Sequence, residues 1–165
     1  MTRKPFYTAR TLVAFVVAAS VAYICATLFY TTNNLMRLSA VGAEISMADA
    51  LRTFLFDVRG MAPSLVWTQF GSVIVIGLAI AFSVAAVLRM LASRSDRTRN
   101  IAPILYPLAG ATAMAVMLAT SYPKYEVFAF PGTRGALGIL AQCIAGAIGG
   151  YLFHLVLARQ EARSS

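Results

Sequence analysis

Four apolar blocks separated by polar stretches dominate the sequence. The blocks cover about residues 11–30, 64–91, 101–121 and 135–157. A helix rises 1.5 Å per residue, so helices of 20 residues or more can cross a hydrocarbon layer of about 30 Å. The pattern predicts an all-α membrane protein in which four transmembrane helices form a bundle, with residues 1–165 making a single integral membrane domain.

A fifth, shorter helix is predicted over about residues 47–59, in the connection between the first two blocks. Ser46 is a suitable N-cap with Asp49 three residues later, whereas Arg52 and Asp57 lie away from the centre of the apolar face. The apolar face consists of Met47, Leu51, Phe54, Leu55 and Val58. This amphipathic, extracytoplasmic helix has two possible positions, on the membrane surface or against the ends of the protein's own helices.

Small residues recur at every fourth position in all four blocks, which places them in a stripe along each helix. The stripes of the first and last blocks are Ala14, Ala18, Ala22 and Ala26, and Gly138, Gln142, Gly146 and Gly150. Those of the middle blocks are Gly77, Ala81 and Ala85, and Ala111, Ala115 and Ala119. Transmembrane helices approach closely where side chains are small, so we expect these residues to pack helices together, the first stripe against the last.

Composition and charge agree with a membrane protein and indicate its orientation. The chain is 59% hydrophobic and 12% charged, against about 25% charged in soluble domains. Of the 14 Lys and Arg residues, nine lie in the amino-terminal head, around residues 89–99 and in the carboxy-terminal tail, and five in the other two connections. The positive-inside rule then places both termini in the cytoplasm. We expect a plasma membrane, a bacterial inner membrane being favoured, with anionic lipid headgroups balancing the net charge of +8.

Few side chains in the apolar blocks carry chemistry. Gln142 lies on the last stripe, where it can hydrogen bond to another helix or line a polar pathway. His154 is the only histidine, near the end of the last block, and is either an interfacial residue or a proton carrier. Cys25 and Cys143 lie in apolar surroundings that favour packing over a disulfide. Because no phosphate-binding, metal-binding or nucleophile motif occurs, we predict no catalytic residue, metal or cofactor.

One connection is rich in aromatic residues. Residues 122–133, YPKYEVFAFPGT, are predicted to form a loop after the third helix. Aromatic side chains at this position are typical of the headgroup layer, and a docking surface for a partner is the alternative.

Three classes of function are compatible with this pattern. The first is a non-catalytic accessory or scaffold subunit that packs through its small-residue faces against another membrane protein or further copies of itself. The alternative is an oligomeric transporter or permeation component for a small apolar or amphipathic molecule. An integral-membrane enzyme is disfavoured because acid–base and metal constellations are missing from the sequence. The expected partners are membrane lipids and membrane proteins rather than nucleic acid.

Overall fold

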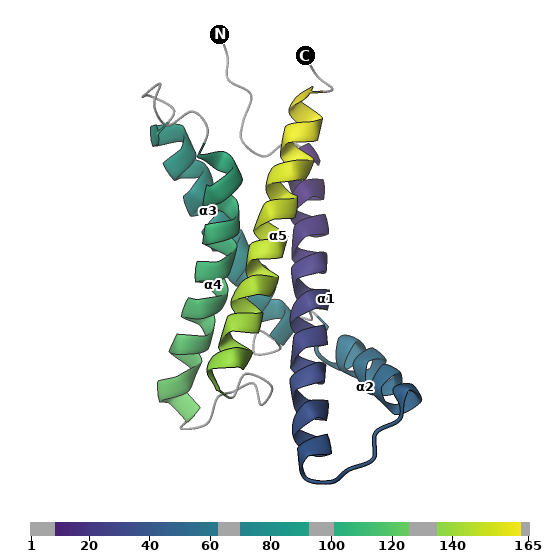
Figure 1. The fold of residues 1–165 in the computed structure, drawn as a ribbon. Helices are drawn as coiled ribbons and strands as arrows, with labels where there is room; N and C mark the ends of the chain where they lie inside the picture. Colours follow the sequence, from purple (N-terminus) through teal and green to yellow (C-terminus); the bar gives the residue numbers. More distant parts are fainter. Residues whose placement is uncertain (1–8, 63–69, 93–100, 126–134, 163–165) are drawn as a thin grey trace.

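The computed structural model describes residues 9–62, 70–92, 101–125 and 135–162. Within these ranges the protein is all helical, with four long helices and one shorter one (Figure 1). The helices are α1 (Ala9–Ala40), α2 (Met47–Gly60), α3 (Phe70–Ala92), α4 (Ala102–Tyr125) and α5 (Ala136–Ala162). The helical fold class is confirmed in the described part of the chain, and α1, α3, α4 and α5 are long and apolar enough to cross a membrane.

Helix α1 continues ten residues beyond Tyr30, where the first apolar block was expected to end. The polar residues that follow Tyr30 change the composition of the helix without breaking it. Gly42 ends this segment, because it adopts a left-handed backbone (φ 92°) and its N–H bonds to the carbonyl of Ser39 at 3.0 Å. The start of α1 and the end of α5 lie at one end of the bundle, opposite α2 (Figure 1).

Other helix limits also differ from the predicted blocks. Helix α4 extends to Tyr125, so residues 122–125 are helical instead of forming the start of the aromatic loop. The rest of that loop, residues 126–133, and the beginning of the second apolar block, residues 64–69, lie outside the described residues. Helix α5 runs five residues beyond the predicted end at residue 157.

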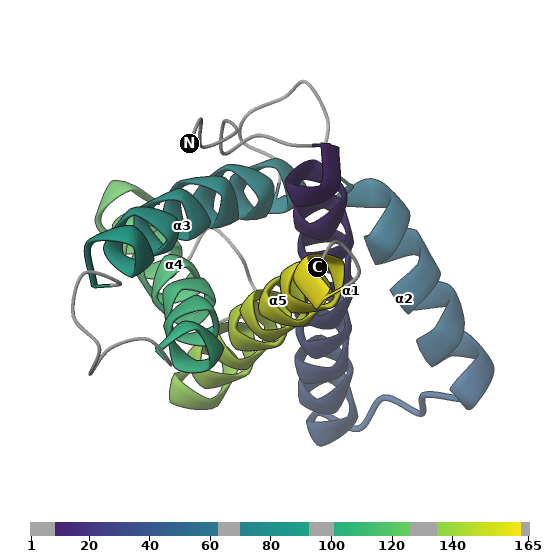
Figure 2. The ribbon, with the colours of Figure 1, turned by 90° about the horizontal axis from the view of Figure 1, so that it is seen from above.

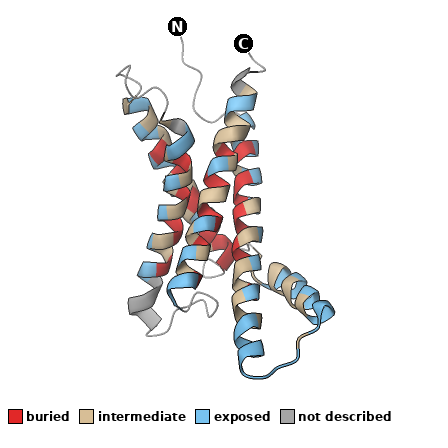
Figure 3. Cartoon of the chain, viewed as in Figure 1, coloured by how far each residue is buried: buried red, intermediate tan, exposed pale blue. Residues whose placement is uncertain are grey.

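Helix α2 begins with the predicted cap. The N–H of Asp49 donates to Ser46 Oγ at 3.2 Å, and the N–H of Ser46 donates to Asp49 Oδ2 at 3.3 Å. This reciprocal pair satisfies two backbone donors that the first turn of a helix leaves without partners. None of the residues of α2 is buried, whereas the long helices each have buried residues along their inner sides (Figure 3).

Helix α5 is the centre of the bundle. It packs along its length against α4 on one side and α1 on the other, and α3 packs against α4 and over a shorter length against α1 (Figure 2). Helix α2 makes its main contacts with α1 alone. The chain therefore forms a bundle in which α5 is held from two sides and α2 stands at its edge.

Candidate functional site

The alanine stripe of α1 faces α5. Its four members, Ala14, Ala18, Ala22 and Ala26, are each 0% exposed. The residue of α5 that fits against this stripe is Gly149: a methyl group there would lie 2.7 Å from Ala22 Cβ and 3.1 Å from the carbonyl oxygen of Ala18. Because both distances are shorter than ordinary van der Waals contact, α1 and α5 approach this closely only with a glycine at 149.

Two members of the α5 stripe, Gly146 and Gly150, face α4. A methyl group on Gly146 would meet the carbonyl oxygen of Gly110 and lie 2.6 Å from Met114 Cγ. A methyl group on Gly150 would meet the carbonyl oxygen of Tyr106. Gly146 and Gly150, which form a GxxxG pair, therefore pack within the chain against the backbone of α4.

Two residues of these contacts, Gly110 and Gly149, are absent from the stripes identified in the sequence. Each neighbours a member of a stripe along the chain, so the four-residue repeat alone selects the adjacent position. The presence of glycine at these positions could have identified them. Glycine lowers helix propensity, so a glycine in the middle of an apolar helix, where the chain does not turn, indicates a close helix contact. The remaining glycine of the predicted α5 stripe, Gly138, is buried near the start of the helix.

The stripes of α3 and α4 are less enclosed. On α3, Ala85 is buried and Gly77 and Ala81 are half-buried; a methyl group on Gly77 would lie 2.5 Å from the sulfur of Met117. On α4, the stripe turns outward, because Ala111 and Ala115 are half-buried and Ala119 is exposed. Thr112 is exposed on the same side of α4. The α4 stripe is thus the one that the fold of the single chain covers least.

Gln142 joins α5 to α1 by a buried hydrogen bond. Its side chain is 1% exposed, and Nε2 donates to the carbonyl oxygen of Ala26 at 3.0 Å. The other atom of the amide, Oε1, has no hydrogen-bond partner among the described residues, and the same holds for the buried Oγ1 of Thr27. Gln142 therefore connects α5 to α1 through its Nε2 donor, while its Oε1 acceptor accepts no hydrogen bond from the described residues.

A polar link connects α1 to α2. The Tyr23 hydroxyl donates to the carbonyl oxygen of Val58 at 2.5 Å, and the Thr31 hydroxyl donates to Asp57 Oδ2 at 2.6 Å. Tyr23, Thr27 and Thr31 are spaced four residues apart and therefore lie on one face of α1. The sequence places Asp57 away from the apolar face of α2 but does not indicate its partner, because Thr31 lies 26 positions earlier and no local spacing connects the two residues.

An aromatic cluster joins the four long helices. Phe82 of α3 stacks on Phe153 of α5 with ring centroids 4.7 Å apart, and Tyr106 of α4 meets Phe153 edge-on at 5.1 Å. Phe15 of α1 contacts Phe82 at 6.3 Å. His154 is half-buried beside this cluster, with its ring stacked on Tyr106 at 6.5 Å. The structure thus places the only histidine against an aromatic ring.

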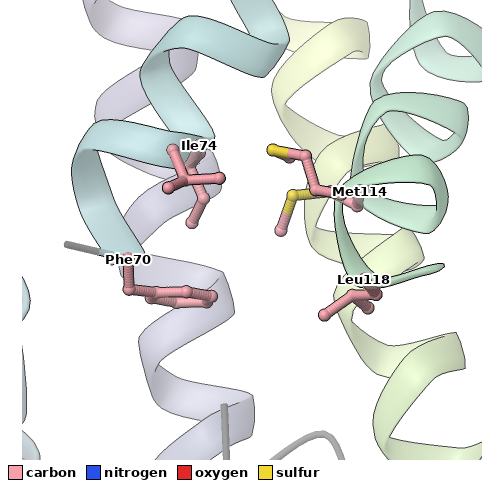
Figure 4. Close-up of a pocket in the computed structure, with 6 residues that line it drawn as sticks. Phe70, Ile74, Met114 and Leu118 are labelled. Carbon is pink, nitrogen blue, oxygen red and sulfur yellow. The ribbon is translucent and has the colours of Figure 1, made fainter. Parts of the chain in front are cut away.

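A small cavity lies between α3 and α4. Figure 4 shows side chains of Phe70, Ile74, Met114 and Leu118 around it, and Val73 and Met117 complete its lining. Its water-sized space is about 10 Å³, about enough for one water molecule. All six lining side chains are apolar, so they offer a polar molecule no hydrogen bonds.

The two cysteine thiols are the remaining reactive side chains, and the described residues around them form no catalytic or metal centre. Cys25 and Cys143 are free thiols, each half-buried in its helix. Among the described residues, no three His, Cys, Asp or Glu side chains are placed to hold a metal ion. Comparisons of the chain with protein-family models, with curated proteins and with solved structures found no match.

Proposed function

We propose that this chain is an integral membrane protein that serves as a non-catalytic scaffold or accessory subunit. Support for insertion comes from the outer surface of the long helices, where large apolar side chains are open. Examples from three helices are Leu12 at 64%, Ile80 at 62% and Leu137 at 82% exposure. Apolar surface of this extent is costly in water and costs nothing against lipid tails. Both termini face the cytoplasm in this proposal, as the distribution of Lys and Arg predicts.

The partner surface in this proposal is the part of the outward face of α4 that carries Ala111, Thr112, Ala115 and Ala119, beside the exposed side chains of Leu108 and Val116. This is the one observation that carries the proposal: the stripes of α1 and α5 are covered by each other and by α4, whereas the α4 stripe is only partly covered, with Ala119 exposed. A second transmembrane helix can approach closely on such a face.

Thr112 adds a polar group to this face. The hydroxyls of Ser83 and Thr120, which are also exposed, bond to the carbonyl oxygens of Ala79 and Val116 at 2.7 and 2.9 Å. No such bond of Thr112 is found within the described residues, so its hydroxyl is available to a neighbouring helix. Hydrogen bonds of this kind add to the association of helices in lipid.

The experiment is co-purification in mild detergent of the unchanged chain, of Ala119→Leu and of Ala158→Leu. Ala119 and Ala158 are both exposed, on α4 and α5, so each leucine leaves the inside of the bundle unchanged. We expect Ala119→Leu to reduce the recovery of a bound partner, or of a homo-oligomer, at least tenfold, because a leucine blocks close approach at the cost of about 1.4 kcal/mol or more. Ala158→Leu should recover as much partner as the unchanged chain. A lone monomer in all three preparations, or equal recovery from the two variants, contradicts the proposal.

A further inference from the structure

Helix α2 has an apolar side that its contact with α1 leaves open. Met47, Leu51 and Leu55 are 86%, 58% and 58% exposed and lie four residues apart, in one stripe along the helix. Arg52 and Arg59 are also exposed, and a turn of about 100° per residue places both beside Leu55 at one edge of this stripe. A short helix with an open apolar stripe bordered by arginines has the pattern of helices that lie in a membrane interface.

The attachment of α2 sets its level along the bundle. Its C-terminal end is bonded to α1 between Tyr23 and Thr31. From Arg10 to Tyr30, α1 rises by about 30 Å, the thickness of the hydrocarbon layer. The α2 attachment therefore extends from the boundary of that layer, at Thr31, to about 10 Å inside it, at Tyr23.

Helix α3 begins at the same level. Tyr30 contacts Phe70, the first residue of α3, with ring centroids 6.4 Å apart. The N–H of Gly71 donates to the carbonyl oxygen of Met61, directly after α2, at 2.9 Å. The end of α2 is thus tied to two long helices where both enter the apolar layer, and the neighbouring surface of α1 is apolar too, with Ile24 and Leu28 at 46% and 45% exposure.

We propose that the open stripe of α2 inserts into the lipid leaflet on its side of the membrane, with the long side chains of Arg52 and Arg59 extending toward the lipid phosphates. The occupant of this surface is lipid because the stripe lies at the leaflet boundary, continues the apolar outer surface of α1 and has cations along its polar edge. The two hydrogen bonds of α1 hold the C-terminal end of α2, so the helix acts as an arm that fixes the depth of the bundle. This inference rests on the membrane insertion proposed above.

The test is the accessibility of nitroxide labels on single cysteines in the full chain, with Cys25 and Cys143 changed to alanine. The labels replace Leu51, Leu55 and Arg52, and the protein is reconstituted in phosphatidylcholine vesicles. Oxygen concentrates in lipid, and a water-soluble nickel chelate is excluded from it. We expect labels at 51 and 55 to relax faster with oxygen than with the nickel chelate, and the label at 52 to show the reverse order.

Two results overturn the proposal. Equal, high nickel accessibility at 51 and 52 places the stripe in water, and low accessibility of 51 and 55 to both reagents places protein over it. A label at Leu28 on the outer surface of α1 separates this failure from that of the proposed function. If Leu28 is accessible to oxygen and Leu51 is not, the α2 proposal alone fails; if Leu28 is open to nickel, membrane insertion itself fails.

A second measurement leaves both cysteines in place. Leu51→Trp in a Trp67→Phe background should lose fluorescence in vesicles of phosphatidylcholine brominated on its acyl chains, and Arg52→Trp in the same background should lose less. Equal quenching of the two variants contradicts insertion of the stripe.

Discussion

The contact between α4 and α5 predicts that one methyl group at Gly146 destabilises the bundle. In Gly146→Ala the new Cβ meets the carbonyl oxygen of Gly110 and lies 2.6 Å from Met114 Cγ, against about 3.5–4.0 Å for carbon atoms in favourable contact. The methionine can move, but the carbonyl belongs to the backbone of α4, so the helices must separate. Such overpacking costs about 1–3 kcal/mol. A gap of roughly 0.5–1 Å also forfeits a quarter to a half of each dispersion contact along the interface, so we expect a loss at the upper end of that range.

Two other glycines calibrate the measurement. Gly60→Ala is the matched control, because no atom lies within 4 Å of the new methyl group. Gly77→Ala is intermediate: its methyl group lies 2.5 Å from the sulfur of Met117, which is part of a flexible side chain and can turn away. Unfolding of the purified variants in mixed detergent, followed by circular dichroism, should rank Gly146→Ala as the least stable, then Gly77→Ala, then Gly60→Ala.

The Gly110→Ala, Gly146→Ala double variant tests whether both methyl groups act on the same contact. A methyl group at either position separates the same two helices. The second substitution should therefore lower the free energy of unfolding by less than it does alone, with a difference of about 0.5 kcal/mol or more. The close approach of α4 and α5 at this point is refuted if Gly146→Ala is as stable as Gly60→Ala. It is also refuted if the losses of stability from Gly110→Ala and Gly146→Ala simply add in the double variant.

Two further changes test the polar and aromatic contacts of α5, each by the same unfolding measurement. Gln142→Leu removes the hydrogen bond to Ala26 and, with it, an acceptor that has no donor in the described part of the chain, so we expect a loss of only about 0.6 kcal/mol; a loss above about 2 kcal/mol would show that Oε1 is bonded. Phe153→Ala removes the ring that stacks on Phe82 and meets Tyr106, and should cost about 3–5 kcal/mol. Phe153→Leu should recover more than half of that loss, and equal stability of the two variants would argue against a packed ring.

The sequence predicted the helices well and their ends less well, for a physical reason. Apolar blocks mark where a helix is compatible with lipid, whereas a helix ends where its backbone turns. In α1 the apolar block ends at Tyr30, but the backbone turns at Gly42, so the helix is ten residues longer than the block. Likewise, Pro123 lies in the last turn of α4 and does not end the helix before Tyr125.

The contacts between helices were less accessible to sequence reasoning. A four-residue repeat identifies a small-residue stripe, but it does not say which helix the stripe faces. Gly149 and Gly150 are neighbours in the sequence and point about 100° apart, so they contact different helices. The bonds from Tyr23 and Thr31 to α2 depend on how a separate helix folds back, and no spacing in the sequence encodes them.

The two glycine faces of α5 explain why this helix is central to the bundle. Gly149 accommodates α1 and the pair Gly146 and Gly150 accommodates α4, so both bare faces of α5 are covered within one chain. A leucine at 146 would therefore damage the bundle before it affected any partner. In the proposed function a second membrane protein therefore binds elsewhere, on the outward face of α4, where Ala119 is exposed. Because that face and the open stripe of α2 lie on different helices, the proposed association through α4 and the proposed lipid contact through α2 can be tested one at a time.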